Sequence, residues 1–99
     1  MLLIRDIMYC KPGQVRPMVE KFKAMNKVMK KMGFSGMRVM TDLSAERYWT
    51  VVAETEVASL EAYGGMDKKL MKDKSLEKIM KGYHDLVDHG RREIYMIQK

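Results

Sequence analysis

The order in which the hydrophobic patterns follow one another most constrains what this chain of 99 residues can fold into. A strand pattern comes first, then apolar residues at the three- and four-residue steps of a helix, then two strands, a helical region and a last strand. This order in so short a chain predicts a single α+β domain over residues 1–99. The expected architecture is a ferredoxin-like βαββαβ fold, a four-stranded antiparallel sheet covered by helices on one face.

Proline, glycine and apolar spacing set the expected boundaries. The first strand ends at Lys11-Pro12-Gly13, because proline has no N–H to give to a sheet ladder and glycine permits the turn. A short polar link between the second and third strands favours an antiparallel hairpin. The predicted elements are strand 2–10, helix 15–32 ending at Gly33, strands 35–41 and 47–56, a brief helix 57–63 ending at Gly64-Gly65, helix 75–89 ending at Gly90, and strand 91–99.

Both faces of the predicted sheet carry apolar residues. The two alternating sets are Tyr48 and Val52 against Trp49 and Val51 in the third strand, and Ile94 and Met96 against Tyr95 and Ile97 in the fourth. Helices on one side cover only one of these faces, and a large exposed apolar surface normally marks an interface. We therefore expect a homodimer that forms through the uncovered face of the sheet.

Composition narrows the classes of function. Twelve methionines predict a soft core or a pocket that adapts to a ligand, because methionine is flexible and polarizable. A solvated helix face is the favoured explanation of the lysines, and attraction of an anion by the net charge of +6 is the alternative. The single cysteine excludes an internal disulfide and a cysteine-based zinc cluster. No signal peptide or apolar run long enough to cross a bilayer is recognisable, so we expect a cytoplasmic protein.

Three motifs, taken in order, resemble the dimeric α/β-barrel superfamily. They are the Arg5…Lys11-Pro12-Gly13 opening, the hairpin with an aromatic third strand, and the closing run Gly90-Arg91-Arg92-Glu93-Ile94-Tyr95. The similarity covers nearly the whole chain and points to the NIPSNAP-like and antibiotic-biosynthesis-monooxygenase-like branch. It implies that two sheets close into a barrel at the dimer interface, with ligand clefts between each sheet and its helices. Cofactor-free quinol monooxygenases, haem-degrading enzymes, lyases of small aromatic substrates and proteins without known activity share that architecture.

His84 and Asp88 are the candidate catalytic residues. They stand one turn apart in the predicted helix 75–89, so the carboxylate could orient the imidazole as a base that removes a phenolic proton. Alternatively, His84 is a boundary histidine that is simply hydrogen bonded to Asp88. His89 is expected to cap the helix C-terminus, where a positive charge is favoured. The histidines match no metal-ligand spacing, so we expect neither a metal nor another cofactor.

Four residues are candidates for substrate binding: Arg5, Trp49, Tyr63 and Tyr83. Trp49 and Tyr63 could stack on a planar ligand, and Tyr83 belongs to the apolar stripe of the last helix. A sheet aromatic such as Trp49 is, however, more often a core or interface residue than a platform for substrate. Arg5, a cation on a half-apolar strand, needs either an anionic ligand or a carboxylate such as Glu54 or Glu56.

These residues leave three functions open. The first is a homodimeric protein that binds a small planar ligand, with cofactor-independent, monooxygenase-like oxidation of an apolar substrate as its enzymatic version. The second is a non-enzymatic structural or regulatory homodimer. The third is RNA binding, because RNA-recognition domains share the element order; residues 47–52 lack their glycine and second aromatic, so no nucleic-acid partner is expected.

Overall fold

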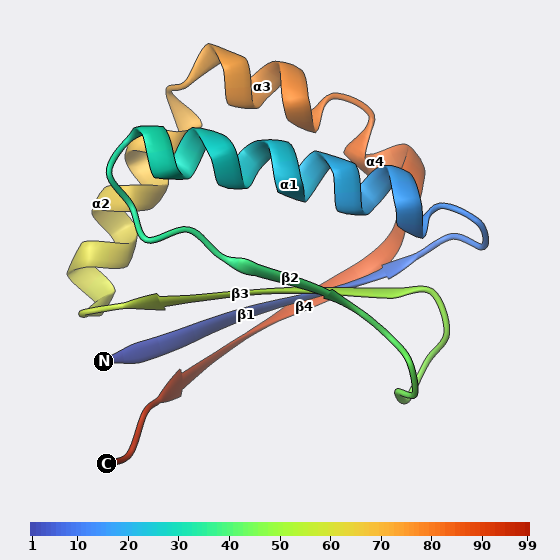
Figure 1. Cartoon of the computed structure of the whole chain (residues 1–99), viewed down its shortest axis with the longest axis horizontal. Helices are drawn as coiled ribbons and strands as arrows, with labels where there is room; N and C mark the ends of the chain where they lie inside the picture. The colour runs from blue at the N-terminus through green and yellow to red at the C-terminus, as the bar shows by residue number, and fades with distance from the viewer.

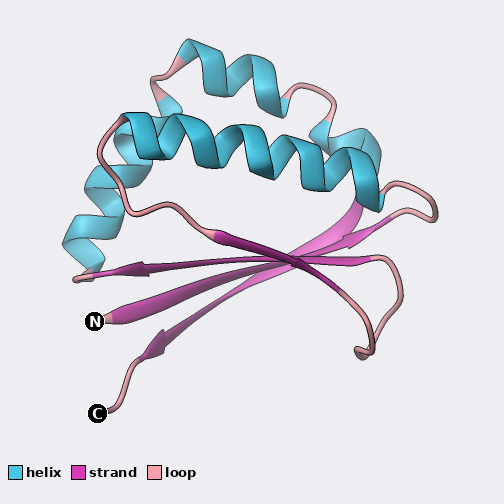
Figure 2. Cartoon of the chain, in the orientation of Figure 1, coloured by secondary structure: helices cyan, strands magenta, loops and turns pink.

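Four antiparallel strands form one sheet, and four helices cover one of its faces, in a computed structural model that describes residues 1–99 (Figures 1 and 2). The elements are β1 (Leu2–Cys10), α1 (Val15–Lys31), β2 (Arg38–Thr41), β3 (Thr50–Val57), α2 (Leu60–Met71), α3 (Lys74–Met80), α4 (Tyr83–Leu86) and β4 (Val87–Met96). The strand order is β2-β3-β1-β4, and every neighbouring pair is antiparallel. The predicted ferredoxin-like α+β fold is confirmed. None of the helices combines the length and apolar character that crossing a membrane requires.

Alternation along β1 decides which face the helices cover. Ile4 and Met8 are each almost fully buried in the apolar clusters beneath the helices, whereas Arg5 between them pairs with Glu54 on the opposite side. That opposite side carries no helix, and we call it the open face. Its side chains are Leu3, Arg5, Ile7, Tyr9, Arg38, Met40, Thr50, Val52, Glu54, Glu56, His89, Arg91, Glu93 and Tyr95.

The hairpin differs from its prediction at both strands. β2 begins at Arg38, because the Asn26 side chain of α1 occupies the backbone groups of Met37. The Asn26 amide nitrogen donates to the Met37 carbonyl, and the Met37 amide donates to the Asn26 oxygen, which holds this residue against the helix. β3 begins at Thr50, so the predicted strand start at Arg47 is wrong. The Thr50 amide donates to the Asp42 carboxylate (2.9 Å), and its hydroxyl donates to the Arg47 carbonyl (2.8 Å). These bonds close a longer β2–β3 loop, residues 42–49, instead of extending the ladder.

α2 corrects the prediction of a brief helix over residues 57–63. β3 continues through Val57, and the Ser59 hydroxyl then caps the helix by accepting a bond from the Ala62 amide (3.1 Å). Gly64-Gly65 does not end the helix. Glycine costs helix stability, but burial of Met66 and Leu70 against the core offsets that cost.

Replacing Gly64 by alanine is expected to raise the free energy of unfolding by roughly 0.5–1 kcal/mol. The position is exposed inside a helix, and an added Cβ would meet no atom within 4 Å. Urea unfolding followed by circular dichroism measures the change. Gly36→Ala is the control, and it is expected to lower the free energy of unfolding. Gly36 has a φ of 83°, and an added Cβ would lie only 2.6 Å from Asn26 Oδ1.

The predicted helix over residues 75–89 is two short helices and the beginning of a strand. α3 ends at Met80, where Lys21 of α1 donates to the carbonyl of Ile79 (3.0 Å). Gly82 then takes a φ of 86°, which turns the chain into the single turn α4. Because β4 starts at Val87, Gly90 lies within a strand and does not terminate a helix.

Candidate ligand-binding site

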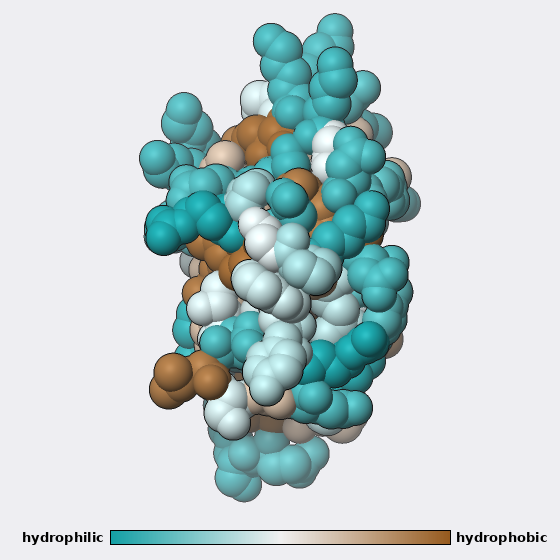
Figure 3. Space-filling model, turned by 90° about the vertical axis from the view of Figure 1, so that its right-hand side faces the viewer, coloured by the Kyte–Doolittle hydropathy of each residue, from teal (hydrophilic) through white to brown (hydrophobic).

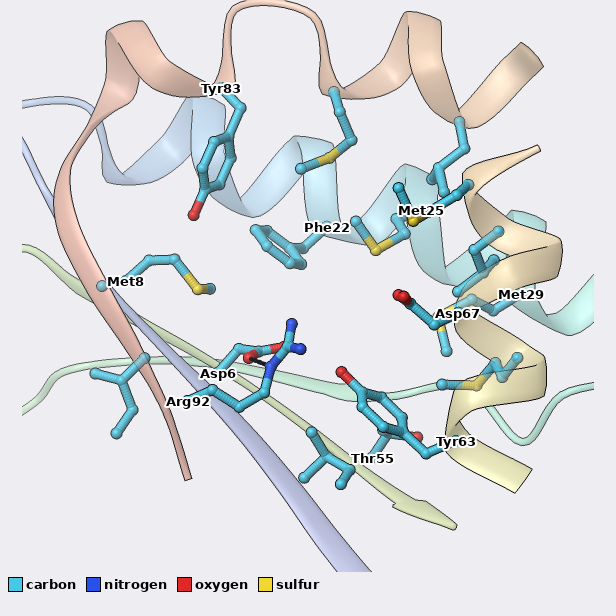
Figure 4. A pocket seen from close by; sticks show the side chains of 18 of the residues that line it. Asp6, Met8, Phe22, Met25, Met29, Thr55, Tyr63, Asp67, Tyr83 and Arg92 are labelled. Carbon is cyan, nitrogen blue, oxygen red and sulfur yellow. Dashed lines mark hydrogen bonds and ion pairs between the residues drawn. The ribbon is translucent and has the colours of Figure 1, made fainter. Parts of the chain in front are cut away.

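A cavity of about 500 Å³ lies between the sheet and its helices (Figure 4). Of the 19 residues that line it, 13 are hydrophobic, and all four helices, β1, β3 and β4 contribute. Half of the chain's methionines are among them: Met8, Met25, Met29, Met66, Met71 and Met80. Its volume and apolar walls are those of a small-molecule site.

An ion pair on the sheet forms the polar floor of this cavity. Asp6 of β1 stands directly opposite Arg92 of β4, and the Arg92 Nε donates to the Asp6 Oδ1 at 2.6 Å. The terminal nitrogens of the guanidinium point into the cavity, away from Asp6 (Figure 4). The hydrogen bond to Asp6 raises the pKa of Arg92 still further, so this group is a permanent cation.

Two phenols reach the same space from the helices. Tyr63 of α2 and Tyr83 of α4 both point their hydroxyls into the cavity, and the Arg92 guanidinium carbon lies 5.5 Å from the Tyr63 ring centroid (Figure 4). Burial raises the pKa of both phenols, and the negative charge of Asp6 raises it further. Both hydroxyls therefore stay protonated at neutral pH and can donate hydrogen bonds.

Asp67 completes the polar set. It lies one turn after Tyr63 on α2, and its carboxylate points into the cavity opposite Arg92 (Figure 4). It forms no ion pair and no side-chain hydrogen bond within the chain. The cavity thus presents Arg92 and two phenols as donors, and Asp67 as a free acceptor or base.

Of the four predicted substrate-binding residues, the structure brings together only Tyr63 and Tyr83. Arg5 lies on the open face, where its Nε donates to the Glu54 carboxylate at 2.7 Å. Of the two partners considered for Arg5, an anionic ligand or a carboxylate, the structure shows the carboxylate. Trp49 lies in the β2–β3 loop, beside Tyr48 and Val15, outside the cavity.

The predicted catalytic pair is not formed. His84 is exposed on α4 and lies edge-on to the Tyr83 ring (5.3 Å between centroids), but it does not line the cavity. Because α4 ends at Leu86, Asp88 belongs to β4 and bonds the Nδ1 of His89 at 3.2 Å instead. His89 therefore does not cap a helix. The role of His84 as a base stays a prediction, without the orienting carboxylate that motivated it.

Two further features limit the chemistry of the chain. Cys10 is buried, and this burial raises the pKa of its thiol, which disfavours the reactive thiolate. No group of three or more histidine, cysteine, aspartate and glutamate side chains is placed to hold a metal ion.

Sequence reasoning missed Asp6, Asp67 and Arg92. Asp6 interrupts the apolar set Ile4 and Met8 on the helix-facing side of β1, and such a charge beneath helices needs a partner. That signal was available from alternation alone. Identifying Arg92 as the partner required the β1–β4 register, which brings together residues 86 positions apart.

Comparisons with known proteins identify the fold of the chain. No protein-family model and no curated protein matches the chain, but solved structures match it over almost its full length. A NIPSNAP domain protein from Burkholderia xenovorans has a TM-score of 0.83 and 12% identity, over 99% of this chain and 95% of that one. A NIPSNAP family protein from Agrobacterium tumefaciens has a TM-score of 0.83 and 11% identity, over 98% and 85%.

An antibiotic biosynthesis monooxygenase-like protein from Nitrosomonas europaea aligns over 100% of both chains, with a TM-score of 0.75 and 10% identity. The chain therefore has the ferredoxin-like α+β fold found in NIPSNAP and antibiotic biosynthesis monooxygenase-like proteins. The fold resemblance drawn from the sequence motifs is confirmed.

Proposed function

We propose that the protein is a homodimer that binds a small, planar, largely apolar molecule in the cavity between sheet and helices. The position of Arg92 carries this proposal. A cation held by Asp6 at the floor of a mostly hydrophobic cavity, with its outer nitrogens directed into the space, provides an anchor for an oxygen acceptor. A cavity of about 500 Å³ also argues against a structural module whose cleft is filled by side chains.

The charges indicate which ligand oxygen suits this anchor. Two cations and two carboxylates line the cavity, but the Arg91 guanidinium bonds Tyr9 and Glu93 on the open face, which leaves Arg92 beside Asp6 and Asp67. A fully anionic ligand would therefore meet repulsion from two carboxylates next to one inward-pointing cation. A neutral molecule with a carbonyl or hydroxyl oxygen avoids this cost. Its oxygen would accept from Arg92 and the phenols, while its apolar body contacts Phe22 and the methionines.

The open face supports pairing of two copies. Its charges are largely matched within the face: Glu54 bonds both Arg5 and Arg38 at 2.7 Å, and Arg91 bonds Glu93 at 3.2 Å. Charges that are already paired cost less to remove from water than isolated ones. Two such faces can therefore meet without leaving a buried cation unpartnered.

Asp67 favours oxidation of the ligand as a second, enzymatic proposal. Its free carboxylate shares the cavity with Arg92, so it could take a proton from a ligand hydroxyl while Arg92 stabilises the resulting oxyanion. Dioxygen as co-reactant would then form a carbon–oxygen bond at a ring carbon of the phenolate, and loss of water by cleavage of the O–O bond would give a quinone. One oxygen atom enters the product and the other leaves as water, so dioxygen is the oxidant for the whole change. In this proposal Asp67, rather than His84, is the base, so Asp67→Asn abolishes turnover and His84→Ala leaves it unchanged.

Native mass spectrometry of the purified protein tests both parts of the main proposal. We expect a dimer that retains up to one small molecule per subunit, because the cavity lies within each subunit and is largely apolar. If no mass is retained, titration with planar phenols and quinones tests whether the cavity accepts a ligand. A dimer that binds none of them contradicts the ligand proposal, and a monomer contradicts the dimer proposal.

A further inference from the structure

The β2–β3 loop, residues 42–49, exposes three large apolar side chains. Leu43 is 102% exposed, Tyr48 86% and Trp49 43%. Figure 3 faces the end of the molecule where this loop lies and shows one hydrophobic group projecting from the surface, with further hydrophobic atoms recessed among polar ones above it. Single exposed apolar residues are ordinary, but a group of them on one short loop beside an uncovered sheet face marks a contact surface.

The loop is held in a defined position. The Cys10 amide donates to the Trp49 carbonyl (2.8 Å), and the Arg47 guanidinium lies over the Tyr9 ring (4.8 Å) and bonds the Nε2 of His89 (2.8 Å). Trp49 has a φ of 61°, the only positive value outside glycine in the chain. Such a conformation persists only where surrounding contacts fix it, so the backbone that carries Trp49 is held in one conformation.

The distribution of charge indicates what covers this surface. The helices with their connections, residues 11–37 and 58–86, carry 13 basic and 6 acidic side chains. The strands, the β2–β3 loop and the two ends carry 6 basic and 7 acidic ones. An anionic partner would be drawn to the helices. The sheet side, with balanced charge, is where two copies of a chain of net charge +6 can meet without repulsion.

We infer that the β2–β3 loop of each copy packs across the open face of the other and buries Leu43, Tyr48 and Trp49. A groove of about 370 Å³ between the loop and the open face, with Ile7, Met40 and Val52 among its lining residues, offers a place for an apolar side chain from the partner. The contact is reciprocal, because a two-fold dimer uses the same surface twice. This inference rests on the proposed dimer and adds the element that closes it.

Trp49 is the only tryptophan, so tryptophan fluorescence, excited selectively over the five tyrosines, reports on this loop alone. Emission and acrylamide quenching are measured across a dilution series, with sedimentation velocity giving the dimer fraction. We expect a blue shift and reduced quenching as the dimer forms. Leu43→Ser and Tyr48→Ser are each expected to raise the dimer dissociation constant about tenfold or more. Leu60→Ser is the matched control, since Leu60 is 62% exposed on α2, and it leaves the constant unchanged.

The possible failures are distinguishable. One result would overturn the loop inference but not the dimer proposal. In it, Trp49 of the dimer is quenched as readily as in the monomer, and neither Leu43→Ser nor Tyr48→Ser changes the dissociation constant of the dimer. A protein that sediments as a monomer at every concentration overturns the dimer proposal itself. Neither result bears on ligand binding in the cavity, which is measured separately.

Discussion

Replacing Arg92 by glutamine is expected to weaken ligand binding about 10- to 100-fold, the loss that accompanies removal of one hydrogen bond from a charged donor. Glutamine keeps a polar, hydrogen-bonding group but lacks the charge that aligns a ligand oxygen. Isothermal titration calorimetry with the ligand identified by mass spectrometry measures the change. Asp6 is left without its cation but is partly exposed, so water can solvate it and the fold is expected to persist.

Arg91→Gln is the matched control for this prediction. It removes the same charge from the neighbouring residue. Arg91 also borders the cavity, but its guanidinium bonds the Tyr9 hydroxyl (2.6 Å) and Glu93 on the open face and is therefore not available to the ligand. Affinity for the ligand is expected to stay within a factor of about two, well below the loss of a charged hydrogen bond. Equal losses in both variants would mean that general charge, and not the position of Arg92 in the cavity, governs binding.

Gly90→Ala is expected to lower the free energy of unfolding by about 1–3 kcal/mol, the usual cost of forcing extra atoms into a packed region. A Cβ at this position would lie 2.8 Å from the carbonyl oxygen of Ile7, which belongs to the backbone of the central strand and cannot rotate away. The two strands would have to separate just before the irregularity at Tyr9 and Cys10. Urea denaturation monitored by far-ultraviolet circular dichroism measures the effect.

Gly65→Ala is the companion variant, because an added Cβ there meets nothing within 4 Å. Gly65→Ala is expected to leave the free energy of unfolding unchanged or to raise it. Comparing the two variants therefore distinguishes a steric conflict between neighbouring strands from a general effect of replacing glycine. An unchanged free energy of unfolding in Gly90→Ala would show that β4 can move away from β1 at no cost.

The order of elements could be predicted from sequence because each strong signal is local. The apolar stripe of α1 lies between Lys11-Pro12-Gly13 and Gly33, and the observed helix begins at the predicted residue and ends one residue before the predicted end. β1 covers the predicted residues as well. In both segments, propensity, periodicity and chain breakers favour the same structure.

Where these signals conflict, the prediction was wrong. Residues 76–87 keep helical spacing of apolar side chains, yet Gly82 turns the chain, and pairing of β4 with β1 begins at Val87. Tyr48 and Trp49 have the side chains of a strand, but the bonds among Asp42, Arg47 and Thr50 keep them in a loop. Strand pairing between distant residues and hydrogen bonds from side chains to the backbone determined the structure of these two segments. The periodicity of apolar residues carries no information about either.

The site was only half predictable for a related reason. Tyr83 was found because it belongs to the apolar stripe of the predicted last helix, and Tyr63 because its aromatic ring could stack on a planar ligand. The pair His84 and Asp88 depended on a continuous helix that the structure does not have. Arg92 was overlooked because its importance comes from its partner Asp6, which only the strand register identifies.

The six methionines that line the cavity bear on how this protein would discriminate among ligands. Unbranched thioether chains change rotamer readily, so such walls follow the outline of whatever molecule they enclose. A series of compounds that differ only in ring substitution would then bind with similar strength. Moving or removing the oxygen that faces Arg92 would separate binders from non-binders. A screen for the natural ligand is therefore better organised by the placement of polar atoms than by molecular shape.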